Sequence, residues 1–245
     1  MRVATAAALG LVLCLGSTGC QGDGDTAAAA DSSAGCPKNV TAMLDPAAKP
    51  KTDLRLLIDP TGSFDRSGPD FRAQFTHVAE TAVSERARLT VAVLGGSASG
   101  VELVLSCPAV VPLVRNDQAA KQLTARLTDR LDDALWNGYQ RADSWDKKGS
   151  DIVGGFRSVA DTPPTEGTRL VVIAWTDGVQ NIDARGVDVA LPQATVLMYG
   201  IGHTAGSPLP TTRAEKLVQQ WTDRLRATGA DQVHVHIDLY SGGVV

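Results

Sequence analysis

The sequence lacks any run of basic residues and has few aromatic ones. Its 245 residues include 23 Lys and Arg against 27 Asp and Glu, for a net charge of −4, and only 4% are aromatic. Nucleic-acid binding depends on clustered cationic side chains that neutralise phosphates. With no such cluster, the sequence argues against nucleic acid as a partner.

Long apolar runs are also missing, apart from a short one near the N-terminus. Residues 3–16 are rich in Ala and Leu, but they fall short of the roughly 20 residues that span a bilayer as a helix. A basic start precedes this run, and the small residues 17–19 lead from it into Cys20. That layout is typical of an export signal.

The segment around Cys20 resembles a bacterial lipobox, in which this Cys is lipidated and becomes the first mature residue. It departs from the usual pattern by carrying Ser17 where Leu is preferred. The resemblance implies a signal peptide over residues 1–19, a lipid anchor on Cys20 and a place on the outer face of the cell membrane. An ordinary secreted protein is the alternative. Residues 20–52 begin with a low-complexity Gly/Ala/Asp/Ser stretch, as expected for a flexible tether.

Cysteine is scarce, with four in the chain. In an exported lipoprotein Cys14 would leave with the signal and Cys20 would carry the lipid, so Cys36 and Cys107 remain. Two thiols in an oxidising compartment usually pair, which predicts a disulfide between them. Neither has a second Cys or a His nearby at ligand spacing, which argues against zinc.

The signatures of nucleotide binding and of nucleophilic catalysis are absent as well. The Gly-rich stretch 200–206 has Ala205 where the dinucleotide fingerprint needs its third Gly. None of the four His lies in a nucleophile elbow. His234, His236 and Asp238 alternate along one face of the expected last strand, a spacing that can chelate a transition metal. A partly covered strand face is the commoner reason for that pattern.

From residue 53 onward, apolar strand-like runs alternate with helical periodicity. We expect strands over residues 54–59, 89–94, 101–106, 169–175, 195–201 and 232–240, and helices over 71–87, about 117–144, about 151–161 and 210–228. Nearly continuous apolar strands are typical of a parallel sheet covered on both faces. The short gap before residue 101 indicates a hairpin, hence an antiparallel edge strand. The sequence therefore predicts one Rossmann-like α/β domain over 53–245, with a mostly parallel sheet and helices on both faces.

Three loops carry oxygen-bearing side chains just after expected strands or just before a helix. They read Asp59-Pro-Thr61-Gly-Ser63, then Gly149-Ser150-Asp151, then Thr176-Asp177-Gly178. Sites in open α/β sheets form where such loops converge, at the carboxyl ends of the strands. Each loop taken alone also suits an ordinary turn or a helix cap.

Taken in order, the three loops resemble the von Willebrand factor type A domain and its metal-ion-dependent adhesion site. That family carries Asp-x-Ser-x-Ser, a later Thr, and a later Asp usually followed by Gly. The resemblance covers about residues 53–240 and implies Asp59, Thr61, Ser63, Ser150 and Asp177 as metal ligands. Thr61 stands where the family has Ser, and Ser150 where it has Thr, and both substitutions keep a hydroxyl.

An all-oxygen ligand set suits Mg²⁺, Mn²⁺ or Ca²⁺ rather than zinc or copper. Two carboxylates leave the site near neutral once a divalent cation is bound, and the nearby Asp65 and Asp151 can reinforce or disturb that balance. In the family, an acidic side chain of the partner fills an open coordination position. The resemblance thus implies a module that binds a protein or peptide, not an enzyme. A metal-free scaffold and a metal-assisted hydrolase are the alternatives.

Overall fold

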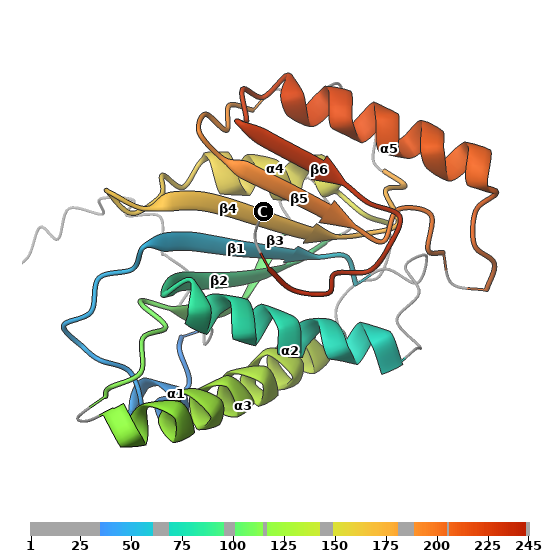
Figure 1. Cartoon of the computed structure of the whole chain (residues 1–245). Coiled ribbons are helices and arrows are strands. Elements are labelled where there is room, and N and C mark those ends of the chain that lie inside the picture. Colours follow the sequence, from blue (N-terminus) through green and yellow to red (C-terminus); the bar gives the residue numbers. More distant parts are fainter. Residues whose placement is uncertain are drawn as a thin grey trace, which may run out of the picture. The chain divides into compact units, whose positions relative to one another are not determined.

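Helices and strands alternate along most of the chain (Figure 1). The computed structural model describes residues 35–60, 69–95, 101–114, 117–142, 149–180, 189–204 and 206–243. Their elements are α1 (Lys38–Thr41), β1 (Thr52–Ile58), α2 (Pro69–Ser84), β2 (Ala87–Leu94), β3 (Val101–Cys107), α3 (Asp117–Ala142), α4 (Ile152–Ala160), β4 (Arg169–Trp175), β5 (Thr195–Tyr199), α5 (Thr211–Arg226) and β6 (Gln232–Val235).

Within the described residues, six strands form one sheet in the order β3-β2-β1-β4-β5-β6. β1 pairs in parallel with β2 on one side and with β4 on the other, while β3 runs antiparallel to β2 at the edge. After β1 the chain adds β2 and β3 on one side of it, and after β4 it adds β5 and β6 on the opposite side. This confirms the predicted fold class, including its antiparallel edge strand. The reversal between β1 and β4 is the point at which open α/β sheets form their sites.

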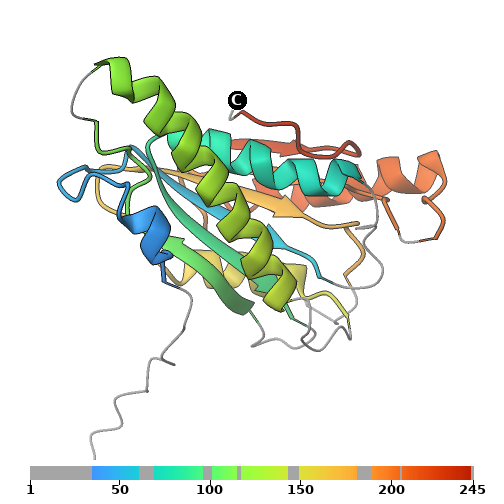
Figure 2. The ribbon, with the colours of Figure 1, turned by 90° about the horizontal axis from the view of Figure 1, so that it is seen from below.

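Helices cover both faces of the sheet (Figures 1 and 2). α2 and α3 lie on one face, where Phe75 and Leu131 belong to a single buried core. α4 and α5 lie on the other, where Phe156 and Trp221 belong to a second core. Successive residues of a strand point to opposite faces. The two cores together explain why β1 and β4 are buried almost throughout.

Two helix ends follow from local backbone chemistry. α2 ends at Ser84 rather than at residue 87, because Arg86 adopts a left-handed φ of 51° that a helix cannot continue through. α4 begins directly after Asp151, whose side chain accepts a 2.8 Å hydrogen bond from the Gly154 amide. That contact is a helix N-cap and holds the start of α4 in place.

The last strand is shorter than predicted. β6 ends at Val235 instead of residue 240, because its neighbour β5 ends at Tyr199 and the chain turns at Gly200, where φ is 88°. The segment after β6 still accepts hydrogen bonds from this turn, because the Ile201 and Gly200 amides donate to the His236 and Asp238 carbonyls at 3.2 and 3.0 Å. Beyond Asp238 it reaches α2. There the Tyr240 amide donates to Gln74 Oε1 at 3.1 Å.

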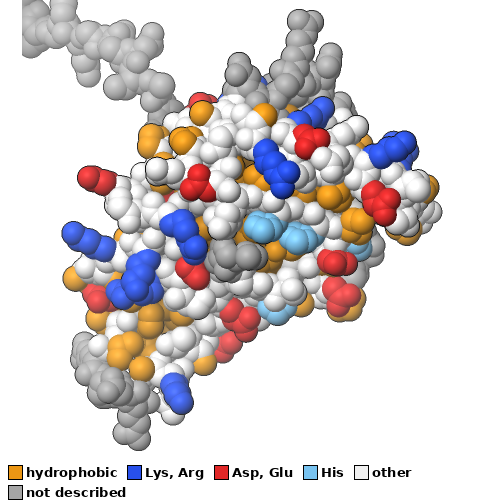
Figure 3. All heavy atoms as spheres, turned by 45° about the horizontal axis from the view of Figure 1, so that its top comes forward, with side chains coloured by type: hydrophobic (Ala, Val, Ile, Leu, Met, Phe, Trp, Pro, Cys, Tyr) orange, Lys and Arg blue, Asp and Glu red, His pale blue; other side chains and the backbone are white. Residues whose placement is uncertain are grey.

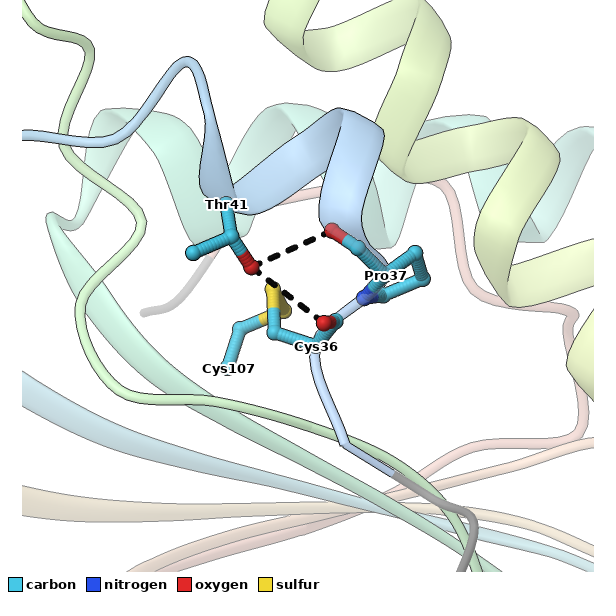
Figure 4. The surroundings of a disulfide bond; sticks show 4 residues. All are labelled: Cys36, Pro37, Thr41 and Cys107. Carbon is cyan, nitrogen blue, oxygen red and sulfur yellow. Dashed lines mark hydrogen bonds between the residues drawn. A yellow bond between two sulfur atoms is a disulfide. The ribbon is translucent and has the colours of Figure 1, made fainter.

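The start of the domain is bound to its body by a disulfide (Figure 4). Cys36 and Cys107 are bonded, which confirms the predicted pairing across 71 residues of sequence. The Thr41 hydroxyl at the end of α1 donates to the carbonyls of Cys36 and Pro37, at 3.2 and 3.1 Å. α1 itself is absent from the sequence-based prediction, which treats residues 20–52 as a tether.

Part of that expected tether is packed into the domain. Of residues 20–52, the structure describes those from 35 onward. Val40 and Leu44 are buried there in the same core as α2 and α3. Residues 1–34, including the predicted signal peptide and Cys20, lie outside the described residues. In the part of the chain that the structure does describe, every helix is too short or too polar to cross a membrane.

Removing the disulfide should lower the free energy of unfolding by about 2–4 kcal/mol, because the unfolded chain then gains the freedom of a long loop. The measurement is urea unfolding of the double variant Cys36→Ser/Cys107→Ser beside the wild type. Added reductant should destabilise the wild type and leave the double variant unchanged. Equal stability of the two proteins would contradict the prediction.

Candidate metal centre

The site begins where β1 and β4 end side by side. The Asp59 amide donates to the Trp175 carbonyl at 2.9 Å, which extends the parallel ladder one residue beyond the last paired positions. Asp59 therefore lies beside Thr176, at the point where the sheet topology reverses. Both side chains are completely buried.

Two hydroxyls converge on one oxygen of Asp59. Ser150 Oγ donates to Asp59 Oδ2 at 2.7 Å, and Thr176 Oγ1 donates to the same atom at 2.9 Å. Ser150 stands just before α4 and is separated from Asp59 by 91 residues of sequence. We call Asp59, Ser150, Thr176 and Asp177 the Asp59 cluster. The contacts within the cluster join segments that are far apart in the sequence. A ligand site needs such tertiary contacts, whereas an ordinary turn forms without them.

Thr176 is the member of the cluster that the sequence reasoning missed. Its hydroxyl also accepts a 3.2 Å hydrogen bond from the Gly178 amide, so it links the Asp59 carboxylate to the turn after β4. The residue lies in the Thr-Asp-Gly stretch that the motif singles out, but only its neighbour Asp177 was assigned a role. The sequence signal that could have identified Thr176 is its position as a polar residue directly after a buried strand.

The turn that carries Asp177 depends on Gly178. Asp177 is completely buried, and its Oδ1 accepts from the Val179 amide at 2.8 Å. Gly178 has a φ of 78°, and a Cβ there would approach the Ile201 side chain to 2.8 Å. Its carbonyl accepts from Trp221 Nε1 at 2.9 Å. A side chain at this position would displace the loop that presents Asp177.

Asp151 takes part in helix capping next to the cluster. Its Oδ1 accepts from the Gly154 amide and from Gln180 Nε2, at 2.8 and 3.1 Å. Gln180 Oε1 in turn accepts from the Ile152 amide at 2.9 Å. These contacts join the loop after β4 to the start of α4, and so they fix the position of Ser150 relative to Asp177.

Three of the five predicted ligands lie within the described residues. Ser150 contacts Asp59 directly, and Asp177 follows the Thr176 that contacts it. The other two, Thr61 and Ser63, lie outside the described residues, as does Asp65. The part of the site contributed by the loop after Asp59 thus stays a prediction.

The chemistry of the described donors fits a hard divalent cation. A hydroxyl that donates its one proton to a carboxylate keeps lone pairs with which to bind a metal. The cluster has two buried carboxylates, and buried charge needs compensation by hydrogen bonds or by a cation. Among the described residues, no three His, Cys, Asp or Glu side chains form a metal-binding group. A cation here would therefore rely on hydroxyls beside the carboxylates, as the adhesion-site motif does.

His234 in β6 and His236 just after it lie at the edge of the sheet beyond β5, whereas the cluster lies at the ends of β1 and β4. Histidine side chains lie side by side on the surface shown in Figure 3. The rings of His234 and His236 stack with centroids 6.2 Å apart, and His236 also stacks on Tyr199 at 4.8 Å. Burial, with a smaller contribution from His234, holds the pKa of His236 below its usual value, although Asp238 opposes the shift.

Comparisons with known proteins give matches only to solved structures. No protein-family model matches the chain, and no curated protein sequence matches it. Among solved structures, the conserved hypothetical protein BatB from Bacteroides thetaiotaomicron matches with a TM-score of 0.45 and 14% identity, over 77% of this chain and 91% of BatB. An aerotolerance-related membrane protein from Bacteroides fragilis matches with a TM-score of 0.41 and 12% identity, over 76% of this chain and 92% of its own.

A third structure is proximal thread matrix protein 1 from the mussel byssus, with a TM-score of 0.40 and 16% identity. The match covers 69% of this chain and 41% of the mussel protein. None of these likenesses bears on the function of this chain.

Replacing Thr176 by Val should lower the free energy of unfolding by about 1–3 kcal/mol, because the Asp59 carboxylate and the Gly178 amide each lose a buried partner. The matched control is Thr195→Val, at another buried threonine whose hydroxyl donates a long hydrogen bond of 3.4 Å to Gln232 Oε1. Chemical denaturation of the two variants gives the comparison. If Thr195→Val proved the more costly change, the role of Thr176 would be refuted.

Acid should destabilise the fold partly through His236. The folded state holds the pKa of this imidazole below the ordinary 6.5, so in mildly acidic solution the unfolded chain binds more protons than the folded one. Stability then falls as the pH drops from about 7 to about 5. Thermal melts at both pH values should show a smaller loss for His236→Gln than for the wild type. An identical loss would show that His236 does not contribute.

Proposed function

We propose that this chain is a binding module of the von Willebrand A type, tethered outside the cell membrane, that engages a protein or peptide ligand through a divalent cation. Asp59, Thr61, Ser63, Ser150 and Asp177 hold the cation. The observation that carries the proposal is the 2.7 Å contact between Ser150 and Asp59, which unites two separate segments of the predicted motif.

The position of the cluster supports this function. Asp59 and Thr176 follow adjacent parallel strands, and Ser150 comes from the loop before α4. The topology reverses between β1 and β4, and in such sheets the loops there separate and leave room for a ligand. A site of this kind is assembled by the fold and does not depend on one loop alone.

The charge of the cluster supports a bound cation. Asp59 and Asp177 bring two negative charges into a buried position, and a divalent cation would neutralise them. Protein side chains seldom fill all the coordination positions of Mg²⁺, which usually keeps several water ligands. When bound, the ion would offer such a position to a carboxylate of the partner, which makes an acidic side chain the recognised group.

Binding, rather than hydrolysis, is the chemistry we assign. Hydroxyl and carboxylate oxygens suit coordination, whereas a hydrolase needs a base placed against a nucleophile. A metal-free scaffold is the second candidate, because the hydrogen bonds from Ser150 and Thr176 already stabilise the Asp59 carboxylate by themselves. The two candidates differ in one measurable property, the affinity for a divalent cation.

The cell-surface part of the proposal rests on the N-terminal sequence. The short apolar run, the small residues 17–19 and Cys20 match the order of a lipoprotein signal. The low-complexity segment that follows would then hold the domain away from the membrane, outside the cell, where a protein ligand can reach the cluster.

The full chain should bind Mg²⁺ or Mn²⁺ in a calorimetric titration, with a single site. At a cation concentration of about one hundred times Kd, the melting temperature should rise by about 5–10 °C. Ser150→Ala and Asp59→Asn should each abolish both effects, because they remove an oxygen ligand or a charge from the cluster. Circular dichroism establishes that each variant is folded.

The matched control is Asp161→Ala, which removes an exposed carboxylate at the other end of α4. It should bind the cation as the wild type does. No heat of binding at millimolar cation would refute the metal site and favour the scaffold. Turnover of a phosphoester or peptide substrate that is lost in Asp177→Ala would instead establish the hydrolase.

A further inference from the structure

One end of the sheet is incompletely covered on the face that carries α4. Arg88 and Thr90 of β2 and Ser106 of β3 lie on this face and are half-buried. Their neighbours Leu89 and Leu105, which point to the α2 and α3 face, are buried in the core. α4 has only nine residues, too few to cover β2 and β3 along their length.

A cleft of about 280 Å³ fills this uncovered region between α4 and the antiparallel edge of the sheet. Ala92, Val101, Leu103 and Val159 give it an apolar side. The hydroxyls of Thr90 and Ser106, which face each other across β2 and β3, lie nearer to Arg88. The cleft is therefore amphipathic, and Arg88, Thr90 and Ser106 form a polar group on its β2 and β3 side.

The two arginines of the cleft differ in their partners. Arg55 is bound by Asp53 through two hydrogen bonds of 3.1 and 3.2 Å, and it also donates to the Val159 and Thr162 carbonyls. Its positive charge and its N–H donors are thus used in contacts within the domain. Within the described residues, Arg88 donates only to the Thr165 hydroxyl, at 3.0 Å, and has no carboxylate partner. Among the residues that the structure describes, the guanidinium of Arg88 is therefore without a direct ion pair.

A second hollow adjoins the first at this charge. It has a volume of about 650 Å³ and shares Arg88 and Ser106 with the cleft. Its lining also includes Thr165 and the turn at Asp45 and Pro46. The Arg88 guanidinium thus stands where the two hollows meet, within reach of a ligand that enters from the more open one.

We propose that this cleft binds a small amphipathic carboxylate, with its anionic group on Arg88 and its apolar part along Ala92, Val101 and Leu103. A single free guanidinium, flanked by hydroxyl donors, matches one carboxylate in charge and in geometry. A cleft of about 280 Å³ has the volume of about nine water molecules, which corresponds to a ligand of about ten non-hydrogen atoms.

This site is separate from the proposed metal centre. Arg88 pairs in register with Asp53 at the start of β1, whereas Asp59 follows its end. At the rise of a β-strand, six residues place the two positions about 20 Å apart. Carboxylate binding at Arg88 therefore needs neither the cation nor the Asp59 cluster, and the two proposals can fail independently.

The probe is octanoate, titrated into the full chain by calorimetry and by amide chemical-shift mapping. It should bind at one site with a Kd of about 1 mM or tighter. The shifts should concentrate on β2 and β3 around Thr90 and Leu103. Arg88→Gln should weaken binding at least tenfold, because it removes the positive charge that would pair with the carboxylate.

The matched control is Arg157→Gln, which removes an exposed charge from α4 and should change the Kd by less than twofold. Asp59→Asn should likewise leave octanoate binding intact. 1-Octanol, with the same chain and no charge, should bind at least tenfold more weakly than octanoate. Equal affinity for the alcohol, shifts spread over the whole surface, or unchanged binding by Arg88→Gln would each overturn the proposal.

Discussion

The parallel pairing of β1 with β4 is the constraint on which the rest of the structure depends. It sets the register that brings Asp59 beside Thr176, and it separates the part of the sheet that runs through β2 and β3 from the part that runs through β5 and β6. Helices then cover each face because both strands contribute buried apolar side chains to the core on each side. The Asp59 cluster lies where β1 and β4 end, and Ser150, just before α4, donates a hydrogen bond to Asp59 there.

Most of the fold was predictable because its signals are local. Apolar runs bounded by turn residues located every strand, and the short gap before β3 identified the antiparallel edge. Apart from the end of α2, the errors occurred where contacts with residues far away in the sequence decide the outcome. β6 ends at Val235 because its neighbour β5 ends at Tyr199. α1 is stabilised by a disulfide and by core contacts, neither of which can be predicted from the helix propensities of its residues.

The candidate site was predictable in its residue types but not in its contacts. Asp59, Ser150 and Asp177 could be named because the order of three loops carries information. That Ser150 and Thr176 meet on the same oxygen of Asp59 follows only from the tertiary structure. The cleft at Arg88 could not be predicted from the sequence, for a related reason. Arg55 bonds Asp53 two residues away, but its other donors reach the Val159 carbonyl 104 positions further on. The hydroxyl that Arg88 contacts, on Thr165, is 77 positions away.

The disulfide at the start of the domain also has a mechanical consequence. A pull on the chain before Cys36 does not first unravel α1, whose four residues offer little resistance. The covalent bond to Cys107 passes the load directly to the end of β3, and so into the hydrogen-bonded sheet. Whatever lies N-terminal to Cys36 can therefore be put under tension while the domain behind it remains folded.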